Sequence, residues 1–174
     1  MARLFSAVDI QEPDLLHKLK EVRDSFDLGF KPVPREKMHI TFQFFQNLDK
    51  TETEQVIEAL DNINISSFKV RVEDVGAFPS QEYIRVVWAG VEDDKFTRLY
   101  KQVCSHKVSS DNSHPFKPHI TLLRISDIRS SEKRKVQRML RDYENHYFGE
   151  LEVDNVNLFQ SKNKEYRKVY TKSL

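Results

Sequence analysis

One order of secondary-structure patterns occurs twice in this sequence, and it limits the possible folds more than any other feature. Short runs rich in β-branched and aromatic residues predict strands, and apolar residues at three- and four-residue steps predict helices. The order strand, helix, strand, helix, strand occurs in the first half and returns roughly 80 residues later. We therefore expect one domain of 174 residues with two related lobes, in which residues 3–76 correspond approximately to residues 83–159.

The individual elements follow from the same patterns. The predicted strands are Leu4–Asp9, Met38–Phe45, Phe68–Val75, Tyr83–Val91, Pro118–Arg124, Leu151–Phe159 and Tyr166–Leu174. The predicted helices have apolar faces formed by Leu15, Leu16, Leu19, Val22 and Phe26, by Val56, Ile57 and Leu60, by Phe96, Leu99 and Val103, and by Val136, Met139 and Leu140. Residues 51–54 have the spacing of a capping box, and the prolines within residues 31–34 predict a break.

The two halves share one short motif, which lies on the second predicted strand of each half. The first copy is Met38–Phe42 (MHITF), and the second is Pro118–Leu122 (PHITL). Because the chain has 6 His and 6 Thr, His-x-Thr is expected by chance only about 0.2 times. Two copies at matching places in a repeated order are therefore poorly explained by coincidence.

Strand geometry places the polar residues of each motif together. Side chains two residues apart on a strand point to the same face, whereas the residues between them point to the other face. Each motif thus presents one imidazole and one hydroxyl, while its isoleucine faces the core. If an approximate twofold axis relates the halves, His39 and Thr41 face His119 and Thr121 across a cleft.

Two imidazoles and two hydroxyls suit the hydrolysis of a phosphodiester. Because the unperturbed pKa of histidine is about 6.5, one imidazole can be neutral and the other protonated near neutral pH. The neutral one can take a proton from water, the protonated one can give a proton to the departing ribose oxygen, and the hydroxyls can donate hydrogen bonds to the phosphate. Because a five-membered cyclic phosphate is strained, these side chains are enough to open it, so we expect no metal and no cofactor.

Two other interpretations of the motifs are compatible with the residues. Each histidine could be structural, with its ring nitrogens satisfied by neighbouring groups. The pair could also bind zinc, although neither motif brings an acidic or cysteine ligand at the usual spacing.

The overall charge favours a local anion site over an extended nucleic-acid surface. The chain has 28 Lys+Arg against 27 Asp+Glu, whereas nonspecific binding to a nucleic-acid backbone usually needs a larger basic excess. Cys104 is the only cysteine, which excludes an intrachain disulfide and a cysteine-based zinc site. No apolar run approaches the roughly 20 residues that cross a bilayer. We expect a cytoplasmic monomer that binds no membrane.

The motifs and their surroundings resemble the two-histidine phosphoesterases. The branch that they resemble is the RNA 2′,3′-cyclic phosphodiesterases, also called 2′–5′ RNA ligases, of the LigT-like family. The likeness covers almost the whole chain. Besides the two motifs it includes residues 3–9 (RLFSAVD), 33–39 (VPREKMH), 76–79 (GAFP), 85–91 (RVVWAGV), 116–124 (FKPHITLLR), 158–161 (LFQS) and Tyr166.

This resemblance implies an α+β fold of two pseudo-symmetric lobes, each an antiparallel sheet with helices packed outside, around a central cleft. It implies metal-independent hydrolysis of RNA 2′,3′-cyclic phosphate ends to 2′-phosphomonoesters, with a weak reverse 2′–5′ joining of RNA ends. By resemblance His39 is the proton donor and His119 the proton acceptor. Thr41, Thr121 and Arg124 bind the phosphate.

The segment after the first motif differs from the family pattern, and a regular strand does not give Arg124 the position that its implied role needs. After the first motif the family often continues Phe-Leu-Gly, whereas this chain has Phe44-Phe45-Gln46, which bears on substrate preference more than on chemistry. Arg124 lies five residues after His119 and would face away from the cleft on a regular strand. It reaches the phosphate only if the strand ends, bulges or twists there.

Several further residues have a functional and a structural interpretation. Phe116 and Lys117 could contact the substrate through base stacking and phosphate binding, or be a core phenylalanine and a solvated lysine. The basic residues beside the first motif could steer RNA or belong to a solvated loop; they are Lys31, Arg35 and Lys37.

The basic residues within 131–141 could likewise contact RNA or form a solvated helix face. We assign no role to the remaining histidines, which are His17, His106, His114 and His146.

Two alternative functions use the same residues. The chain could open a smaller cyclic phosphate, such as a cyclic nucleotide or an ADP-ribose derivative. It could also be an RNA- or nucleotide-binding module without turnover.

Overall fold

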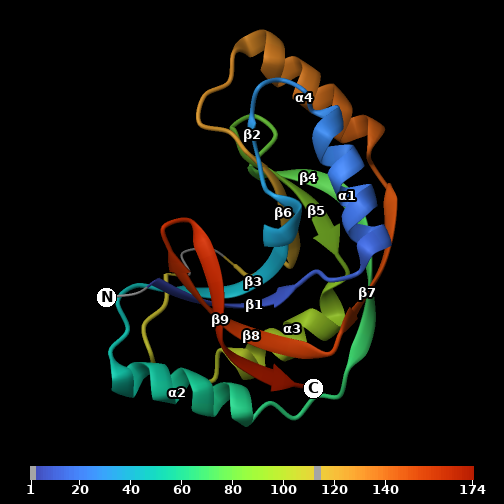
Figure 1. The fold of residues 1–174 in the computed structure, drawn as a ribbon. Coiled ribbons are helices and arrows are strands. Elements are labelled where there is room, and N and C mark those ends of the chain that lie inside the picture. Colours follow the sequence, from blue (N-terminus) through green and yellow to red (C-terminus); the bar gives the residue numbers. More distant parts are fainter. Residues whose placement is uncertain (1–2, 112–114) are drawn as a thin grey trace.

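Two antiparallel β-sheets and four α-helices make up the computed structural model, which describes residues 3–111 and 115–174 (Figure 1). The first sheet has the spatial order β3 (His39–Phe45), β1 (Arg3–Asp9), β8 (Asn155–Lys162) and β9 (Glu165–Ser173). The second sheet has the order β2 (Lys31–Pro32), β6 (His119–Arg124), β5 (Ile84–Val91), β4 (Phe68–Pro79) and β7 (Tyr147–Val153). The predicted α+β class with two antiparallel sheets is confirmed.

The helices cover the sheets on their outer sides. They are α1 (Pro13–Ser25), α2 (Lys50–Asp61), α3 (Asp93–Val103) and α4 (Ser130–Asp142), with a 3₁₀ turn η1 at Arg35–Lys37. Helices α1 and α4 lie beside the second sheet, and α2 and α3 lie beside the first (Figure 1). Helix α1 follows β1 of the first sheet but contacts β6 and β7 of the second. Helix α3 follows β5 of the second sheet, and its Phe96 packs on Phe42 of β3 in the first.

The apolar stripes identified in the sequence are the buried faces of these helices. Leu15, Leu16, Leu19 and Val22 of α1 are buried, as are Phe96, Leu99 and Val103 of α3. They join buried residues of both sheets in one continuous core, in which Phe45 and Phe148 are among the largest fully buried side chains. Within the described residues, none of the helices is both long enough and apolar enough to span a membrane.

Helix α2 begins earlier than the sequence pattern predicts. Asp49 is the N-cap: its carboxylate accepts a hydrogen bond from the backbone N–H of Glu52 at 2.8 Å. The Glu52 carboxylate in turn accepts from the backbone N–H of Asp49 at 3.0 Å, which completes a capping box. The box expected at residues 51–54 is therefore wrong, because Thr51 already lies inside the helix.

Two expected segments also differ from the structure. The single strand predicted at Leu151–Phe159 is two strands, β7 and β8, which are separated at Asp154 and belong to different sheets. Both segments contribute buried residues to the core, so the apolar pattern is not interrupted where the chain crosses from one sheet to the other. The expected break at residues 31–34 contains the short strand β2, whose proline, Pro32, limits it to an edge pairing with Leu123 and Arg124 of β6.

The two motif strands meet where the sheets adjoin. Strands β3 and β6 contact each other, and each begins with the histidine of its motif. The strand order β3-β1-β8-β9 in the first sheet is matched by β6-β5-β4-β7 in the second. Each motif strand therefore has a corresponding neighbour, β1 for β3 and β5 for β6.

Candidate active site

The two motif histidines have the same hydrogen bond to the backbone. Nδ1 of His39 lies 2.7 Å from the carbonyl oxygen of Lys37, and Nδ1 of His119 lies 2.7 Å from the carbonyl oxygen of Lys117. Because a carbonyl can only accept, Nδ1 is the protonated nitrogen in both rings. Each Nε2 is then left to accept or donate a proton.

Aromatic rings pack against both imidazoles. His39 packs against Phe5 and Tyr166, with ring centroids 5.0 and 5.6 Å away. His119 packs edge-on against Phe78 at 4.9 Å and lies 6.4 Å from the ring of Trp88. These contacts, together with the bonds to the carbonyls, fix the orientation of each ring.

A β-bulge occurs at the same place in both motifs. Between β1 and β3 the register runs from Ala7↔Thr41 to Ser6↔Gln43, which leaves Phe42 unpaired. Between β5 and β6 the register runs from Trp88↔Thr121 to Val87↔Leu123, which leaves Leu122 unpaired. An extra residue in one strand resets the alternation of side chains.

The bulge determines where Arg124 points. Leu122 and Leu123 are both buried, so the alternation changes between them and Arg124 is exposed on the face of His119 and Thr121. Arg124 lines the same cavity as His39 and Thr121, so it does reach the cleft. On β3 the corresponding exposed residue is Phe44.

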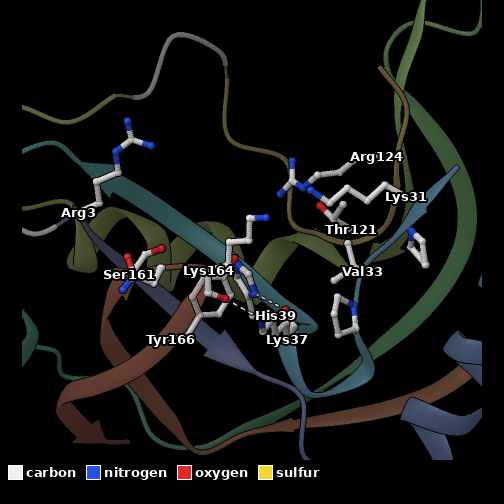
Figure 2. Close-up of a pocket in the computed structure, with 13 residues that line it drawn as sticks. Arg3, Lys31, Val33, Lys37, His39, Thr121, Arg124, Ser161, Lys164 and Tyr166 are labelled. Carbon is white, nitrogen blue, oxygen red and sulfur yellow. Dashed lines mark hydrogen bonds between the residues drawn. The ribbon is translucent and has the colours of Figure 1, made fainter. Parts of the chain in front are cut away.

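A cavity of about 500 Å³ lies beside the first motif. Its lining includes His39, Thr121 and Arg124 from the motif strands, and cationic groups of Arg3, Lys31, Lys37 and Lys164. Figure 2 shows Arg124 and Lys31 at one side of the cavity and Arg3 at the other, with His39 between them. The arrangement suits an anionic ligand.

His119 and Thr41 are less directly exposed to this cavity. Neither belongs to its lining, but His119 lies close enough for its charge to lower the pKa of His39. Thr41 follows His39 by two residues on β3 and is half-buried, as Thr121 is on β6.

The two histidines share three electrostatic influences and differ in the other charges that act on them. Burial lowers the pKa of both, the bond to the backbone carbonyl raises it, and the Arg124 charge lowers it. Lys117 lowers the pKa of His119 further, whereas the Asp9 carboxylate raises that of His39.

Asp9 is a residue that the sequence patterns did not single out. It lies opposite His39 in the β1–β3 ladder, and the residue opposite His119 in the β5–β6 ladder is Gly90. Its carboxylate accepts hydrogen bonds from Asn157 at 2.7 Å and Gln11 at 2.8 Å, and pairs with Lys168 at 3.0 Å. Its place opposite His39 depends on the pairing of β1 with β3, which no local sequence pattern indicates.

The hairpin between β8 and β9 supplies further lining residues that had no assigned role. They are Ser161, Asn163, Lys164 and Tyr166. Lys37 joins the hairpin to the first motif, because its Nζ donates to the carbonyl of Lys164 at 2.6 Å and lies 5.7 Å from the centre of the Tyr166 ring. A chain-terminal hairpin far from either motif carries no local signal for this role.

The other residues considered for substrate contact differ in whether they line the cavity. Phe116 stacks on Tyr100 at 4.2 Å and on Phe42 at 5.9 Å, and it packs against the core rather than lining the cavity. Lys117 places its Nζ 4.4 Å from the centre of the Trp88 ring. Lys31 and Lys37 line the cavity, whereas Arg35 is absent from its lining.

The remaining histidines have other partners. His17 lies 3.4 Å from Glu21, His106 bonds to Gln43 at 2.8 Å, and His146 packs against Phe148. His114 lies outside the described residues. On α4 the basic residues Arg134, Lys135, Arg138 and Arg141 are exposed. In the described part of the chain, no group of three or more His, Cys, Asp or Glu side chains could hold a metal ion.

The chain is similar to known proteins over most of its length. The model of the family described as LigT like phosphoesterase matches the chain twice, over residues 8–88 and 91–170. An Archaeoglobus fulgidus protein named RNA 2′,3′-cyclic phosphodiesterase is 33% identical over 164 residues, which cover 91% of this chain and 90% of the relative. A protein of the same name from Methanocaldococcus jannaschii is 28% identical over 163 residues, 91% of each chain. The crystal structure of the Thermus thermophilus protein TT0787 has a TM-score of 0.76 and 25% identity, and the match covers 99% of this chain and 97% of that one.

Proposed function

Because this chain belongs to the LigT-like phosphoesterase family, we propose that it hydrolyses RNA 2′,3′-cyclic phosphate ends to 2′-phosphomonoesters without a metal. Relatives named for the cyclic phosphodiesterase activity match about nine-tenths of the chain. The observation that carries the proposal is the pair of imidazoles, each with Nδ1 bonded to a carbonyl at the start of one of two adjoining strands. The basic cavity beside them supports an anionic substrate.

In the proposed reaction a water oxygen attacks phosphorus while the bond from phosphorus to O3′ breaks. Nε2 of His119 takes the proton of the water, and Nε2 of His39 gives a proton to O3′. The singly charged 2′,3′-cyclic phosphate thus becomes a 2′-phosphomonoester with a free 3′-hydroxyl. The proton then returns from His119 to His39 through solvent.

The assignment of donor and acceptor is supported by the charges around the rings. A proton donor benefits from a nearby carboxylate, and Asp9 acts on His39. A proton acceptor benefits from a cation that keeps it neutral, and the Lys117 charge lowers the pKa of His119, whereas Arg124 lowers the pKa of both rings and does not distinguish them. Both effects point the same way, so His39 is the acid and His119 the base.

The phosphate is held by groups on the motif strands. The hydroxyls of Thr41 and Thr121 donate hydrogen bonds to non-bridging oxygens, and Arg124 contributes a positive charge that stabilises the crowded pentavalent transition state. If a 5′-hydroxyl takes the place of water, the same steps join two RNA ends through a 2′–5′ linkage. We propose this joining as a weak side reaction, because water is far more abundant than RNA ends.

The proposal is tested by the position of the phosphate in the product. Purified protein is incubated in a chelator with an oligoribonucleotide that ends in a 2′,3′-cyclic phosphate, and phosphorus NMR identifies the product. We expect full turnover with the phosphate on O2′. A phosphate on O3′ would contradict the role of His39, and turnover that requires an added divalent metal would contradict the metal-free reaction.

The same assay separates the two alternatives. A cyclic mononucleotide that is turned over much faster than the RNA end would favour a small-molecule phosphodiesterase. Tight binding of RNA without product after long incubation would favour a binding module.

A further inference from the structure

A second cavity opens beside the active-site cavity. It has a volume of about 240 Å³ and shares Arg3, Ser161 and Tyr166 with the first cavity. Its other lining residues include Phe44, Gln46 and Asp111. Because the same side chains line both, the two cavities lie next to each other.

Phe44 provides an aromatic face in this second cavity. Its side chain is 46% exposed, and its ring packs against Phe5 at 5.7 Å. The bulge at Phe42 turns Phe44 to the open side of β3, as the bulge at Leu122 turns Arg124 on β6. The first motif thus ends in an aromatic group where the second ends in a cation. An exposed aromatic face beside a phosphate site suits the stacking of a nucleobase.

Polar groups border the aromatic face. Gln46 donates a hydrogen bond from Nε2 to the Asp111 carboxylate at 2.8 Å, and the backbone N–H of Asp111 donates to the carbonyl of Phe44 at 2.9 Å. These bonds hold residue 111 against the end of β3. The amide oxygen of Gln46 and the second carboxylate oxygen of Asp111 are left to accept from a base edge.

Arg3 supplies a cation between the two cavities. It is exposed, and it forms no ion pair with any residue that the structure describes. In Figure 2 its guanidinium lies across the cavity from that of Arg124. Two separated cations suit two successive phosphates of one strand.

We propose that the second cavity binds the nucleotide that precedes the cyclic end, with its base on Phe44 and its phosphate at Arg3. This inference rests on the proposed function and specifies its substrate as an oligoribonucleotide rather than a mononucleotide.

The test compares two cyclic phosphates that differ by one nucleotide. Values of kcat/KM are measured for uridine 2′,3′-cyclic phosphate and for the dinucleotide UpU with a 2′,3′-cyclic phosphate. We expect the dinucleotide to be favoured by about tenfold in the native protein, the size of one base–aromatic stack. In Phe44→Ala this ratio should approach one.

Matched variants control for effects on folding. Tyr147→Ala removes an aromatic ring of nearly the same exposure, 47%, from β7 at the far edge of the second sheet, and it should keep the native ratio. Arg3→Ala should reduce the slope of log kcat/KM against log salt for the dinucleotide by about 0.7, as expected for one lost phosphate contact on a single strand. Thermal unfolding verifies that each variant is folded.

The outcomes separate the subsite from the function on which it rests. Equal kcat/KM for both substrates in the native protein, or a tenfold preference that persists in Phe44→Ala, would overturn the subsite alone. If neither substrate is turned over, the proposed function fails. The affinities of the two 2′-phosphate products, measured by calorimetry, then decide the subsite: tighter binding of the dinucleotide that is lost in Phe44→Ala supports it, and equal binding overturns it.

Discussion

Asp9 lies opposite His39 across the β1–β3 ladder, and although burial lowers the pKa of that histidine, the Asp9 carboxylate opposes the lowering, an influence that His119 lacks. In the corresponding ladder of the second sheet, the residue opposite His119 is Gly90, which carries no charge. Burial is the largest influence on both rings and lowers the pKa of each. The neighbouring charges are what differ between the two. This asymmetry supports different proton-transfer roles for two otherwise similar motifs.

Asp9→Asn should change one limb of the pH profile. His39 must be protonated to donate, so its pKa sets the basic limb of kcat/KM, whereas the pKa of His119 sets the acidic limb. Removal of the Asp9 charge lowers the pKa of His39, and the basic limb should move to lower pH while the acidic limb stays. A pH series of kcat/KM measures this shift. Asp14→Asn, at an exposed carboxylate in the first turn of α1, should leave both limbs in place. A shift of the acidic limb in Asp9→Asn would mean that the two roles are exchanged.

Replacement of either motif histidine should nearly abolish turnover. His39→Ala and His119→Ala each remove one proton transfer, which contributes on the order of 10²–10⁴ in rate. Single-turnover rates on a cyclic-phosphate RNA end measure the loss. His17→Ala is the matched control, because this exposed histidine pairs with Glu21 on α1. Full activity in either motif variant would exclude that histidine from the reaction.

Arg124→Gln should weaken substrate binding and also shift both limbs of the pH profile. Loss of a charge-assisted bond to the phosphate costs about 1.5–3 kcal/mol, or roughly 10- to 150-fold in kcat/KM. Burial is the larger influence on both rings, but Arg124 lowers the pKa of each. Both limbs should therefore move to higher pH. Arg85→Gln, on β5 outside the cavity lining, should have neither effect. An unchanged kcat/KM in Arg124→Gln would show that Arg124 does not bind the phosphate.

Sequence patterns predicted those parts of the fold that local periodicity controls. The apolar stripes of the helices and the alternation of His, Ile and Thr depend on residues a few positions apart, so they are visible in the chain. The pairing partner of a strand is not local. For this reason the crossing at Asp154 was missed, and the predicted strand Leu151–Phe159 joined two strands of different sheets.

The same distinction holds for the site. The two motifs were evident, but the side on which Arg124 lies depends on a bulge that is defined only by the register with β5. Asp9 acts through its partner strand, and the hairpin residues reach the cavity because β8 pairs with β1. Phe116 illustrates the converse: an aromatic residue beside a motif stacks on Tyr100 of α3 and packs against the core, a contact that no local pattern indicates.

Gly76 should be required for the geometry around His119. A Cβ at this buried position would lie 2.2 Å from Cζ2 of Trp88, a ring that packs near His119 and under the ammonium of Lys117. Because the indole is 7% exposed and packed on Phe78, it cannot move without disturbing its neighbours. Gly76→Ala should therefore cost about 1–3 kcal/mol in the free energy of unfolding, measured by urea denaturation, and should lower kcat through displacement of the His119 ring. Gly29→Ala is the comparison: its φ of +72° gives a strain of about 1–2 kcal/mol, yet no atom lies within 4 Å of its Cβ, so kcat should not change. If both variants lose similar stability but only Gly76→Ala loses activity, the loss arises from the displaced indole; if Gly76→Ala keeps native kcat, the packing of Trp88 has no part in positioning His119.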